Sequence, residues 1–252
     1  MDLRLTGKRC LITGASQGIG KGTARIMAAE GCKVAILARR TDLLNDLADD
    51  IAATGVERPI VISEDITAQG APQVIREQVY DAFGGLDILI NSAGGSRPIP
   101  WDSPDDVWYE GMTLNFEMLR RVTMAFLHDM RAQKWGRVIN ITGSSEPRGV
   151  NVANAAKGAV HLWSKGLSRE VGGDGITVNC LPPGRINSEQ ILTKVHPDPV
   201  EREAFAKENI PAGYFGEPED MGNLIAFLSS PLARYINGEV IHVDGGLRRF
   251  AL

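Results

Sequence analysis

The sequence has few of the residues on which several classes of protein depend. Its 252 residues include three cysteines and 6% aromatic residues, and no apolar run approaches the ~20 residues of a membrane-spanning helix. Three well-separated cysteines do not make the framework of a disulfide-stapled domain. We therefore expect them to be buried apolar side chains in a reducing compartment, the cytoplasm, and we expect no metal site.

The charge of the chain argues against nucleic acids and membrane surfaces as partners. The net charge is −4, and no block of basic residues interrupts the chain, so neither nucleic acid nor a membrane surface is an expected partner. The apolar fraction of 43% is large enough to fill a core, and the charged fraction of 23% suits an exposed surface. At 252 residues the chain could hold two small domains, but one α/β domain of this length is common.

Residues 9–20 combine a short apolar run with three glycines and lead into a helical pattern. Gly14, Gly18 and Gly20 stand where a predicted strand feeds a predicted helix, so the backbone can pass very close to a ligand there. The free N–H groups and the positive end of the helix dipole favour a phosphate. The spacing G-x-x-x-G-x-G, with no Lys-Ser/Thr after it, argues against a Walker A loop. We predict a dinucleotide-binding turn, and an ordinary tight turn is the alternative.

Apolar strand patterns alternate with helical patterns along the rest of the chain. Predicted strands cover residues 10–12, 33–38, 59–63, 86–90, 138–141, 176–180 and 240–243, and predicted helices cover 21–29, 41–53, 71–83, 105–133, 154–171 and 218–228. Strands that alternate with helices imply right-handed crossovers and a parallel sheet covered on both faces. The predicted fold class is α/β, a single-domain Rossmann-type doubly wound parallel sheet over residues 1–252.

In such a sheet the ligand lies beyond the carboxyl ends of the strands. The segments expected along this rim are 14–20, 39–40, 65–66, 91–94, 142–145 and 183–187. After the second strand, a carboxylate usually holds a ribose 2′-hydroxyl, whereas a 2′-phosphate needs cationic groups. The chain has Arg39 and Arg40 there and no acid. We therefore expect NADP(H) to be favoured over NAD(H), and a solvated pair of arginines is the alternative.

Several of these segments resemble one protein family. The segments that carry the resemblance are Thr-Gly-x-x-x-Gly-Ile-Gly at 13–20, Asn-Ser-Ala-Gly at 91–94, Asn115, Pro-Gly-Arg-Ile at 183–186 and Gly-Glu-Val-Ile-His-Val-Asp-Gly-Gly at 238–246. They are similar to the signatures of the short-chain dehydrogenases/reductases. The last segment is close to that of members that include the 3-oxoacyl-carrier-protein reductases.

The resemblance implies a set of cofactor-binding residues and a reaction. The implied cofactor-binding residues are Gly14, Ser16, Gln17, Gly18, Ile19, Gly20, Arg39, Arg40, Asp65, Ile66, Asn91, Ala93, Gly94, Lys157, Pro183, Gly184 and Ile186. The implied substrate is a small carbonyl or alcohol compound. The family commonly pairs the helices expected at 105–133 and 154–171, so the resemblance implies a homo-oligomer, a dimer or a tetramer.

The sequence departs from the family at its catalytic residues. The family uses a Tyr four residues before a Lys, and here Lys157 is present but Ala153 stands in the Tyr position. The position of the family's catalytic Ser is taken by Gly143, and Ser144 follows it. We therefore assign Asn115, Ser144 and Lys157 as the candidate catalytic residues.

Other polar groups lie near the missing Tyr. Ser145 is an alternative to Ser144, although either serine can instead belong to a turn. Glu146 is the nearest carboxyl that could act as an acid or a base, and Asn154 shares a helix face with Lys157. His161 has no second ligand at metal-binding spacing and is interpreted as structural.

Residues 187–216 follow the last rim segment and are rich in charge, which suits a substrate lid.

Two functions remain open from the sequence. The first is an NADP(H)-dependent oxidoreductase that interconverts a carbonyl and an alcohol through a substituted proton relay. The second is a nucleotide-binding protein, or a non-redox lyase or isomerase, on the same fold. The preserved glycines and Lys157 favour the first, whereas Ala153 and Gly143 favour the second.

Overall fold

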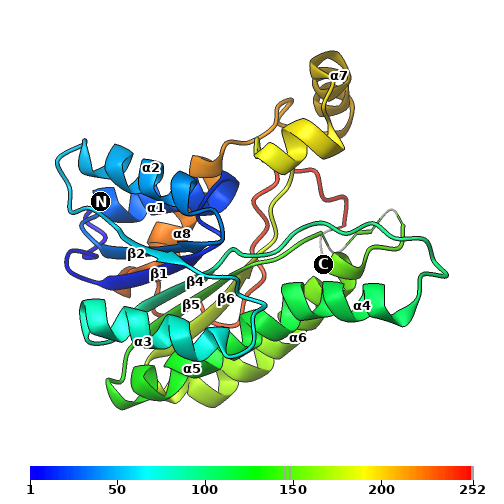
Figure 1. Cartoon of the computed structure of the whole chain (residues 1–252). Helices are drawn as coiled ribbons and strands as arrows, with labels where there is room; N and C mark the ends of the chain where they lie inside the picture. The colour runs from blue at the N-terminus through cyan, green and yellow to red at the C-terminus, as the bar shows by residue number, and fades with distance from the viewer. Residues whose placement is uncertain (145, 148, 251–252) are drawn as a thin grey trace.

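The computed structural model of the chain describes residues 1–144, 146–147 and 149–250. Six strands alternate with helices over these residues (Figure 1). The strands are β1 (Arg9–Thr13), β2 (Lys33–Ala38), β3 (Ile60–Ser63), β4 (Ile88–Asn91), β5 (Gly136–Ile141) and β6 (Ile176–Leu181). The α-helices are α1 (Gly18–Ala29), α2 (Thr41–Ala52), α3 (Ala71–Phe83), α4 (Asp105–Met112), α5 (Met118–Ala132), α6 (Val152–Val171), α7 (Pro199–Asn209) and α8 (Pro218–Ser229).

The strands form one sheet in the order β3-β2-β1-β4-β5-β6, and every neighbouring pair is parallel. The order reverses between β1 and β4, which is the switch point where ligands bind in sheets of this kind. All residues of β4, β5 and β6 are buried, because helices cover both faces of the sheet, and the strands therefore do not alternate between buried and exposed residues. The predicted doubly wound α/β fold is confirmed.

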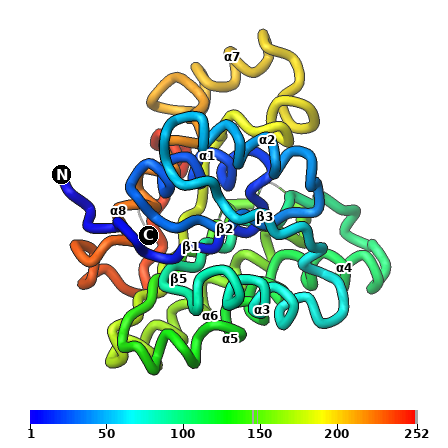
Figure 2. The backbone as a smooth tube through the Cα atoms, turned by 60° about the vertical axis from the view of Figure 1, so that its left-hand side comes forward, coloured from blue at the N-terminus to red at the C-terminus, as the bar shows by residue number. Residues whose placement is uncertain are grey.

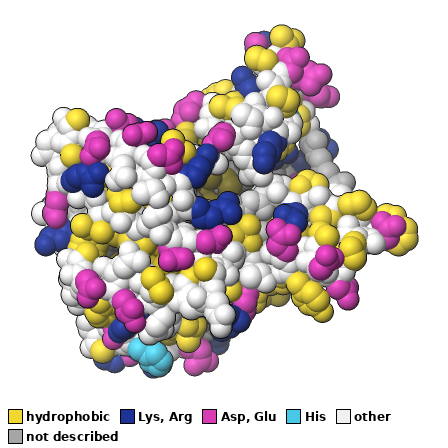
Figure 3. Space-filling view, viewed as in Figure 1, with side chains coloured by type: hydrophobic (Ala, Val, Ile, Leu, Met, Phe, Trp, Pro, Cys, Tyr) yellow, Lys and Arg dark blue, Asp and Glu magenta, His cyan; other side chains and the backbone are white. Residues whose placement is uncertain are grey.

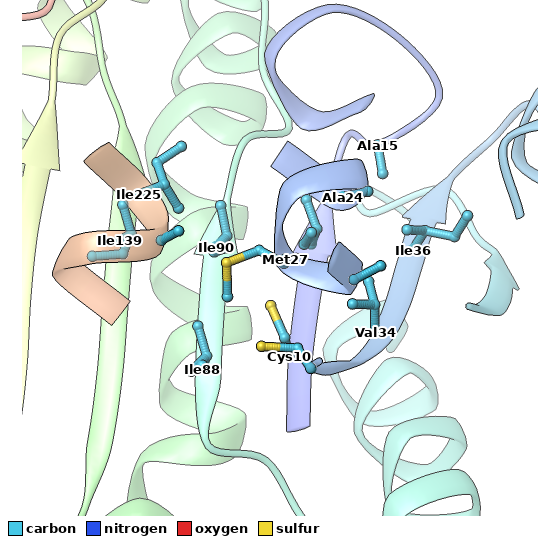
Figure 4. Packing of buried hydrophobic residues seen from close by; sticks show 14 of the residues in the cluster. Cys10, Ala15, Ala24, Met27, Val34, Ile36, Ile88, Ile90, Ile139 and Ile225 are labelled. Carbon is cyan, nitrogen blue, oxygen red and sulfur yellow. The ribbon is translucent and has the colours of Figure 1, made fainter. Parts of the chain in front are cut away.

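Two helical layers cover the sheet, with α1, α2 and α8 on one face and α3, α5 and α6 on the other (Figures 1 and 2). The side chains of successive strand residues point toward opposite helical layers. Cys10 and Ile12 belong to the core under α1 and α8, whereas Leu11 belongs to the core under α3 and α5. Figure 4 shows the first core, where Met27 of α1 and Ile225 of α8 lie against the strand side chains.

The helix predicted at 105–133 is not uniform. A π-helical turn, η1 (Thr113–Glu117), separates α4 from α5. A π-turn inserts one residue into the helix and re-aims the side chains within it, often at a functional site. Asn115 lies in this turn. The periodicity of the sequence predicts a helix over this range, and the π-helical turn within it was not predicted.

The strand predicted at 240–243 is wrong in this form. The structure shows isolated parallel bridges there, from Cys180 to Val240 and from Pro183 to Val243. Cys180 and Gly184 donate backbone hydrogen bonds to this segment, but Pro182 between them has no N–H to donate, so the ladder beside the end of β6 is interrupted.

Residues 187–216 leave the sheet and carry α7, which projects from the body of the molecule (Figure 1). This segment has its own small apolar cluster, formed by Ala206, Ile210 and Phe215. Over the described part of the chain, no helix combines the length and the apolar character that crossing a membrane requires.

Candidate functional site

A cavity of about 1860 Å³ opens at the carboxyl ends of the strands. Its wall includes residues that follow each of the six strands, and Figure 3 shows Lys and Arg side chains beside a hollow on this face. Most of the predicted site residues line it. The predicted residues in the wall are Gly14, Ser16, Gln17, Gly18, Ile19, Arg39, Arg40, Asp65, Ile66, Ala93, Gly94, Ser144, Lys157, Pro183 and Gly184.

Four predicted residues do not line this cavity, namely Gly20, Asn91, Asn115 and Ile186. A Cβ at Gly20 would lie 2.5 Å from the carbonyl oxygen of Gly14, so this glycine permits close packing inside the turn. The Asn91 side chain donates to Asn140 Oδ1 at 2.8 Å and to Thr123 Oγ1 at 3.0 Å. Both residues support the cavity from behind its wall.

The glycine turn between β1 and α1 fits a phosphate group. Gly14 and Gly18 have φ angles of +69° and +54°, in the left-handed region that favours glycine. A Cβ at Gly14 would lie 2.8 Å from the backbone of Ala93, so a larger residue cannot be placed there. Helix α1 begins at Gly18 without a side-chain cap and without an acidic residue in its first turn. Its N-terminal dipole is therefore available to an anion.

The two arginines after β2 have different surroundings. Arg40 donates to Ser16 Oγ at 3.4 Å and to Gln17 Oε1, and it lies 3.3 Å from Glu189 Oε2. The Arg39 side chain is 77% exposed and lies 3.9 Å from Asp65. Arg40 is thus the arginine that lies against the glycine turn.

Asp65 is held by its own loop. Its Oδ1 accepts hydrogen bonds from the Thr67 hydroxyl at 2.7 Å and from the Thr67 backbone N–H at 2.9 Å. These hydrogen bonds lower the pKa of the Asp65 carboxyl, and Arg39 adds a smaller effect in the same direction. The carboxylate is therefore fixed and charged at the end of β3.

Lys157, which lines the cavity, and Asn115, which lies behind its wall, are both close to Gly94. Lys157 Nζ donates to the carbonyl oxygen of Ile141 at 2.8 Å, and Asn115 Oδ1 accepts from the backbone N–H of Gly95 at 3.1 Å. A Cβ at Gly94 would lie 2.8 Å from Asn115 Oδ1 and 3.1 Å from Lys157 Nζ, so Gly94 lies between the two side chains. The π-turn and α6 thereby bring the two predicted residues together.

The Lys157 ammonium is buried without a carboxylate partner among the described residues. Burial lowers the pKa of Lys157 to about 8, because removal from water disfavours the charged form. A lysine with this pKa is a stronger acid than a solvated lysine and is still mostly protonated at neutral pH. It can hold a proton and release it.

Small residues leave space beside Lys157. Ala153 lines the cavity and is 4% exposed. A Cβ at Gly143 would lie 3.4 Å from Asn154 Oδ1 and 3.6 Å from Lys157 Cγ. Asn151 caps α6 by accepting from the Ala153 backbone N–H at 2.9 Å, which fixes the start of this helix.

The loop after β5 is tied to the C-terminal segment. Ser144 Oγ accepts from the Glu146 backbone N–H at 3.0 Å, which is a turn contact, although Ser144 still lines the cavity. The Glu146 carboxylate accepts from the backbone N–H groups of Arg249 and Phe250, both at 3.1 Å. Glu146 therefore anchors the C-terminal segment, and Ser145 lies outside the described residues.

Two histidines near the site were not predicted to take part. His161 Nε2 lies 2.8 Å from Thr142 Oγ1, and its pKa is lowered, mainly by burial. His242 lines the cavity, and burial followed by the charge of Arg248 lowers its pKa. The only sequence feature that linked His161 to the site was its position four residues after Lys157. Within the described ranges, no group of three His, Cys, Asp or Glu side chains is placed to hold a metal ion.

Known proteins resemble the chain over nearly its whole length. A model of the family described as enoyl-(acyl carrier protein) reductase matches residues 14–248. The chain is 33% identical over 249 residues to the 3-oxoacyl-[acyl-carrier-protein] reductase of Vibrio cholerae, a match that covers 97% of this chain and 99% of that protein.

Solved structures share the fold closely. L-sorbose reductase from Gluconobacter frateurii, complexed with NADPH and L-sorbose, has a TM-score of 0.92 at 29% identity over 99% of this chain and 100% of its own. A 7α-hydroxysteroid dehydrogenase complexed with NADH and a 7-oxo bile acid conjugate has a TM-score of 0.91 at 29% identity over 97% and 96% of the two chains. Because these neighbours hold different nicotinamide cofactors, the fold alone does not select between them.

The buried ammonium has a consequence for stability. Lys157→Met removes a charge that the folded protein holds at a lowered pKa, so we expect it to raise the free energy of unfolding at pH 7 by roughly 1–3 kcal/mol. The cost of the buried ammonium is fully present below about pH 8 and disappears above the ordinary lysine pKa. The gain should therefore shrink as the pH rises through this interval in urea unfolding experiments.

The matched control is Lys165→Met on the same helix, where the side chain is 54% exposed and pairs with Glu239. This change should alter stability little or lower it slightly. A Lys157→Met variant that is less stable than the wild type at pH 7 would contradict the interpretation.

Proposed function

The chain belongs to the short-chain dehydrogenases/reductases, and from this premise we propose that it is an NADP(H)-dependent oxidoreductase that interconverts a carbonyl and an alcohol. The observation that carries the proposal is one cavity whose wall includes both Arg40 and the buried Lys157. A nucleotide with a 2′-phosphate and a reactive ring at its far end matches both features.

Three free, buried cysteines suit a reducing compartment, which we take to be the cytoplasm.

We assign different parts of the cofactor to different residues of the cavity. We assign the pyrophosphate to the turn that contains Gly14, Gly18 and Ile19, because the uncapped N-terminus of α1 is directed there. Asp65 and Ile66 border the adenine end, and Pro183 and Gly184 border the opposite end. A nicotinamide ring bound there supplies or accepts a hydride.

Lys157 is the proposed source of the proton in carbonyl reduction. A carbonyl oxygen that gains negative charge needs a proton, and a positioned acid typically contributes ~10²–10⁴-fold to the rate. With Ala153 in the Tyr position, the ammonium of Lys157, which lines the cavity and has a pKa of about 8, can supply a proton near neutral pH. We propose that it donates through a water molecule in the space beside Ala153 and Gly143. Ser144 orients the substrate oxygen, and Asn115 holds the backbone at Gly95.

We propose that residues 187–216 form a lid that selects the substrate. The segment begins in the cavity wall, where Ser188, Glu189 and Gln190 lie, and continues into the projecting α7. Such a position allows it to close over a bound substrate and exclude water.

A second function keeps the same fold without hydride transfer. Ala153 and Gly143 leave no phenol or serine in the family's catalytic positions, and Glu146 is engaged by the C-terminal segment. These observations favour a nucleotide-binding protein, a lyase or an isomerase. NADPH binding with no turnover over a broad panel of ketones and diketones would favour this second function.

Cofactor choice tests the adenosine end of the site. The wild type is expected to bind NADPH more tightly than NADH in fluorescence titrations. Arg40→Ala should cost roughly 1.5–3 kcal/mol of NADPH binding, the usual contribution of a hydrogen bond to a charged group, and should leave NADH binding nearly unchanged. Arg39→Ala should cost less, because its side chain is 77% exposed.

Arg58→Ala is the control, because Arg58 pairs with Asp49 at 2.7 Å and does not line the cavity. Its affinities for both cofactors should equal those of the wild type. Equal affinity of the wild-type protein for NADPH and NADH would refute the proposed preference.

The proton source is tested with two changes in α6. Lys157→Arg retains the positive charge but releases no proton near neutral pH, so carbonyl reduction should fall by about 10²–10⁴-fold. Ala153→Tyr should give little gain, because Lys157 already supplies the proton. Single-turnover oxidation of NADPH measures both rates, with cofactor affinity determined separately and Lys165→Arg as the control. A hundredfold gain from Ala153→Tyr would show that the site is a disabled form of the family's Tyr scheme.

Assembly is the last part of the proposal. On α6, Leu162 is 80% exposed and Ala155 is also exposed, and Tyr109 of α4 is 69% exposed. Apolar side chains on one face of a helix suit pairing with a second copy. We expect light scattering at micromolar concentration to show a dimer or tetramer, and Leu162→Glu to shift it toward the monomer. A monodisperse wild-type monomer would contradict this expectation.

A further inference from the structure

The start of the 187–216 segment lies directly on the cofactor-binding turn. Ser188 Cβ is 3.0 Å from the place where a Cβ on Gly18 would stand. Asn187 is tied to the other end of the same segment, because its backbone N–H donates to the Gly216 carbonyl at 2.8 Å. The next residue after Ser188 therefore projects toward the far side of the turn, where Arg40 lies.

Glu189 forms an ion pair with Arg40 across 149 positions of sequence. Both terminal nitrogens of Arg40 lie 3.3 Å from Glu189 Oε2. Arg40 is also in contact with Ser16 and Gln17 of the glycine turn. A carboxylate from the lid segment thus lies on the arginine that we assign to the 2′-phosphate.

The ion pair is too exposed to be a major stabiliser of the fold. The Arg40 and Glu189 side chains are 42% and 52% exposed, and exposed pairs typically contribute ~0–1 kcal/mol. A doubly charged phosphate beside Arg40 would repel the Glu189 carboxylate, since both anions require the same cation. The contact is therefore weak enough to be exchanged.

We propose that Glu189 is an internal anion that competes with the 2′-phosphate of the cofactor for Arg40. A cofactor with a 2′-phosphate displaces the carboxylate and releases the first turn of the lid segment. A cofactor with a 2′-hydroxyl leaves the Arg40–Glu189 pair in place. This inference rests on the proposed NADP(H) site, and it makes Glu189 a residue that sets both cofactor discrimination and lid position.

The first test compares Glu189→Gln with Glu201→Gln at low ionic strength. Glu189→Gln removes the competitor, so the dissociation constant for NADPH should fall roughly two- to fivefold, the factor that corresponds to an exposed ion pair. The constant for NADH should stay within about twofold, because an exposed pair contributes little to its binding. Glu201→Gln removes the same charge from α7, where the side chain does not line the cavity, and should change neither constant.

The second test follows the lid segment by hydrogen exchange. Backbone amides of residues 188–196 in the wild type should exchange faster with saturating NADPH than with saturating NADH. In Glu189→Gln, this difference between the two cofactors should disappear.

The outcomes separate this inference from the proposed function. If the wild type prefers NADPH but Glu189→Gln behaves as Glu201→Gln does in both measurements, the role of Glu189 is refuted and the cofactor site stands. If the wild type binds the two cofactors equally and Glu189→Gln prefers NADPH, the proposed preference fails and the competition stands. If the protein binds neither cofactor, both are refuted.

Discussion

Lys157 extends from α6 into the interior, where its ammonium group donates to the Ile141 carbonyl and meets no carboxylate in the described part of the chain. A buried charge without a counter-ion costs stability, so such a group is retained where its chemistry is needed. The surrounding features follow from this constraint. Gly94 is small enough to lie between Lys157 and Asn115, and the small residues Ala153 and Gly143 line the cavity together with Lys157.

The charged side chain of Arg40, in contrast to that of Lys157, is accessible to solvent. Arg40 is partly exposed and has a carboxylate from a distant segment as its partner. An ion pair of this kind is exchanged easily, whereas the side chains behind the wall are buried and joined by hydrogen bonds from Asn91 to Asn140 and from Asn140 to Ser164. The cavity therefore has an exchangeable ion pair at Arg40 and a buried, hydrogen-bonded layer behind its wall.

Local patterns in the sequence were sufficient to predict most of the helices and strands of the fold. The predicted elements at Lys33–Ala38 and Ala71–Phe83 have the observed bounds, because an apolar run or an amphipathic period is complete within each. The glycine turn and the arginines after β2 were found for the same reason, since each is contiguous in the chain. The predicted seventh strand is wrong because Pro182 lacks the backbone N–H that a continuous ladder needs.

Contacts between distant segments were not predictable. Glu146 looked like a free acid, but its carboxylate is 103 positions from the Arg249 backbone N–H that it accepts from. The Arg40–Glu189 pair depends on the path of the chain after β6. The π-turn that contains Asn115 was not predicted either, because the expected helix was treated as uniform.

The claim that this cavity performs hydride transfer is tested most directly by an isotope. NADPH that carries deuterium at the transferable position of the nicotinamide should be incubated with the protein and a panel of ketones and diketones, and the alcohol products analysed by mass spectrometry. Our account predicts an alcohol that carries one deuterium at the new carbinol carbon. Saturating NADPH binding without deuterium in any product across the panel would contradict it.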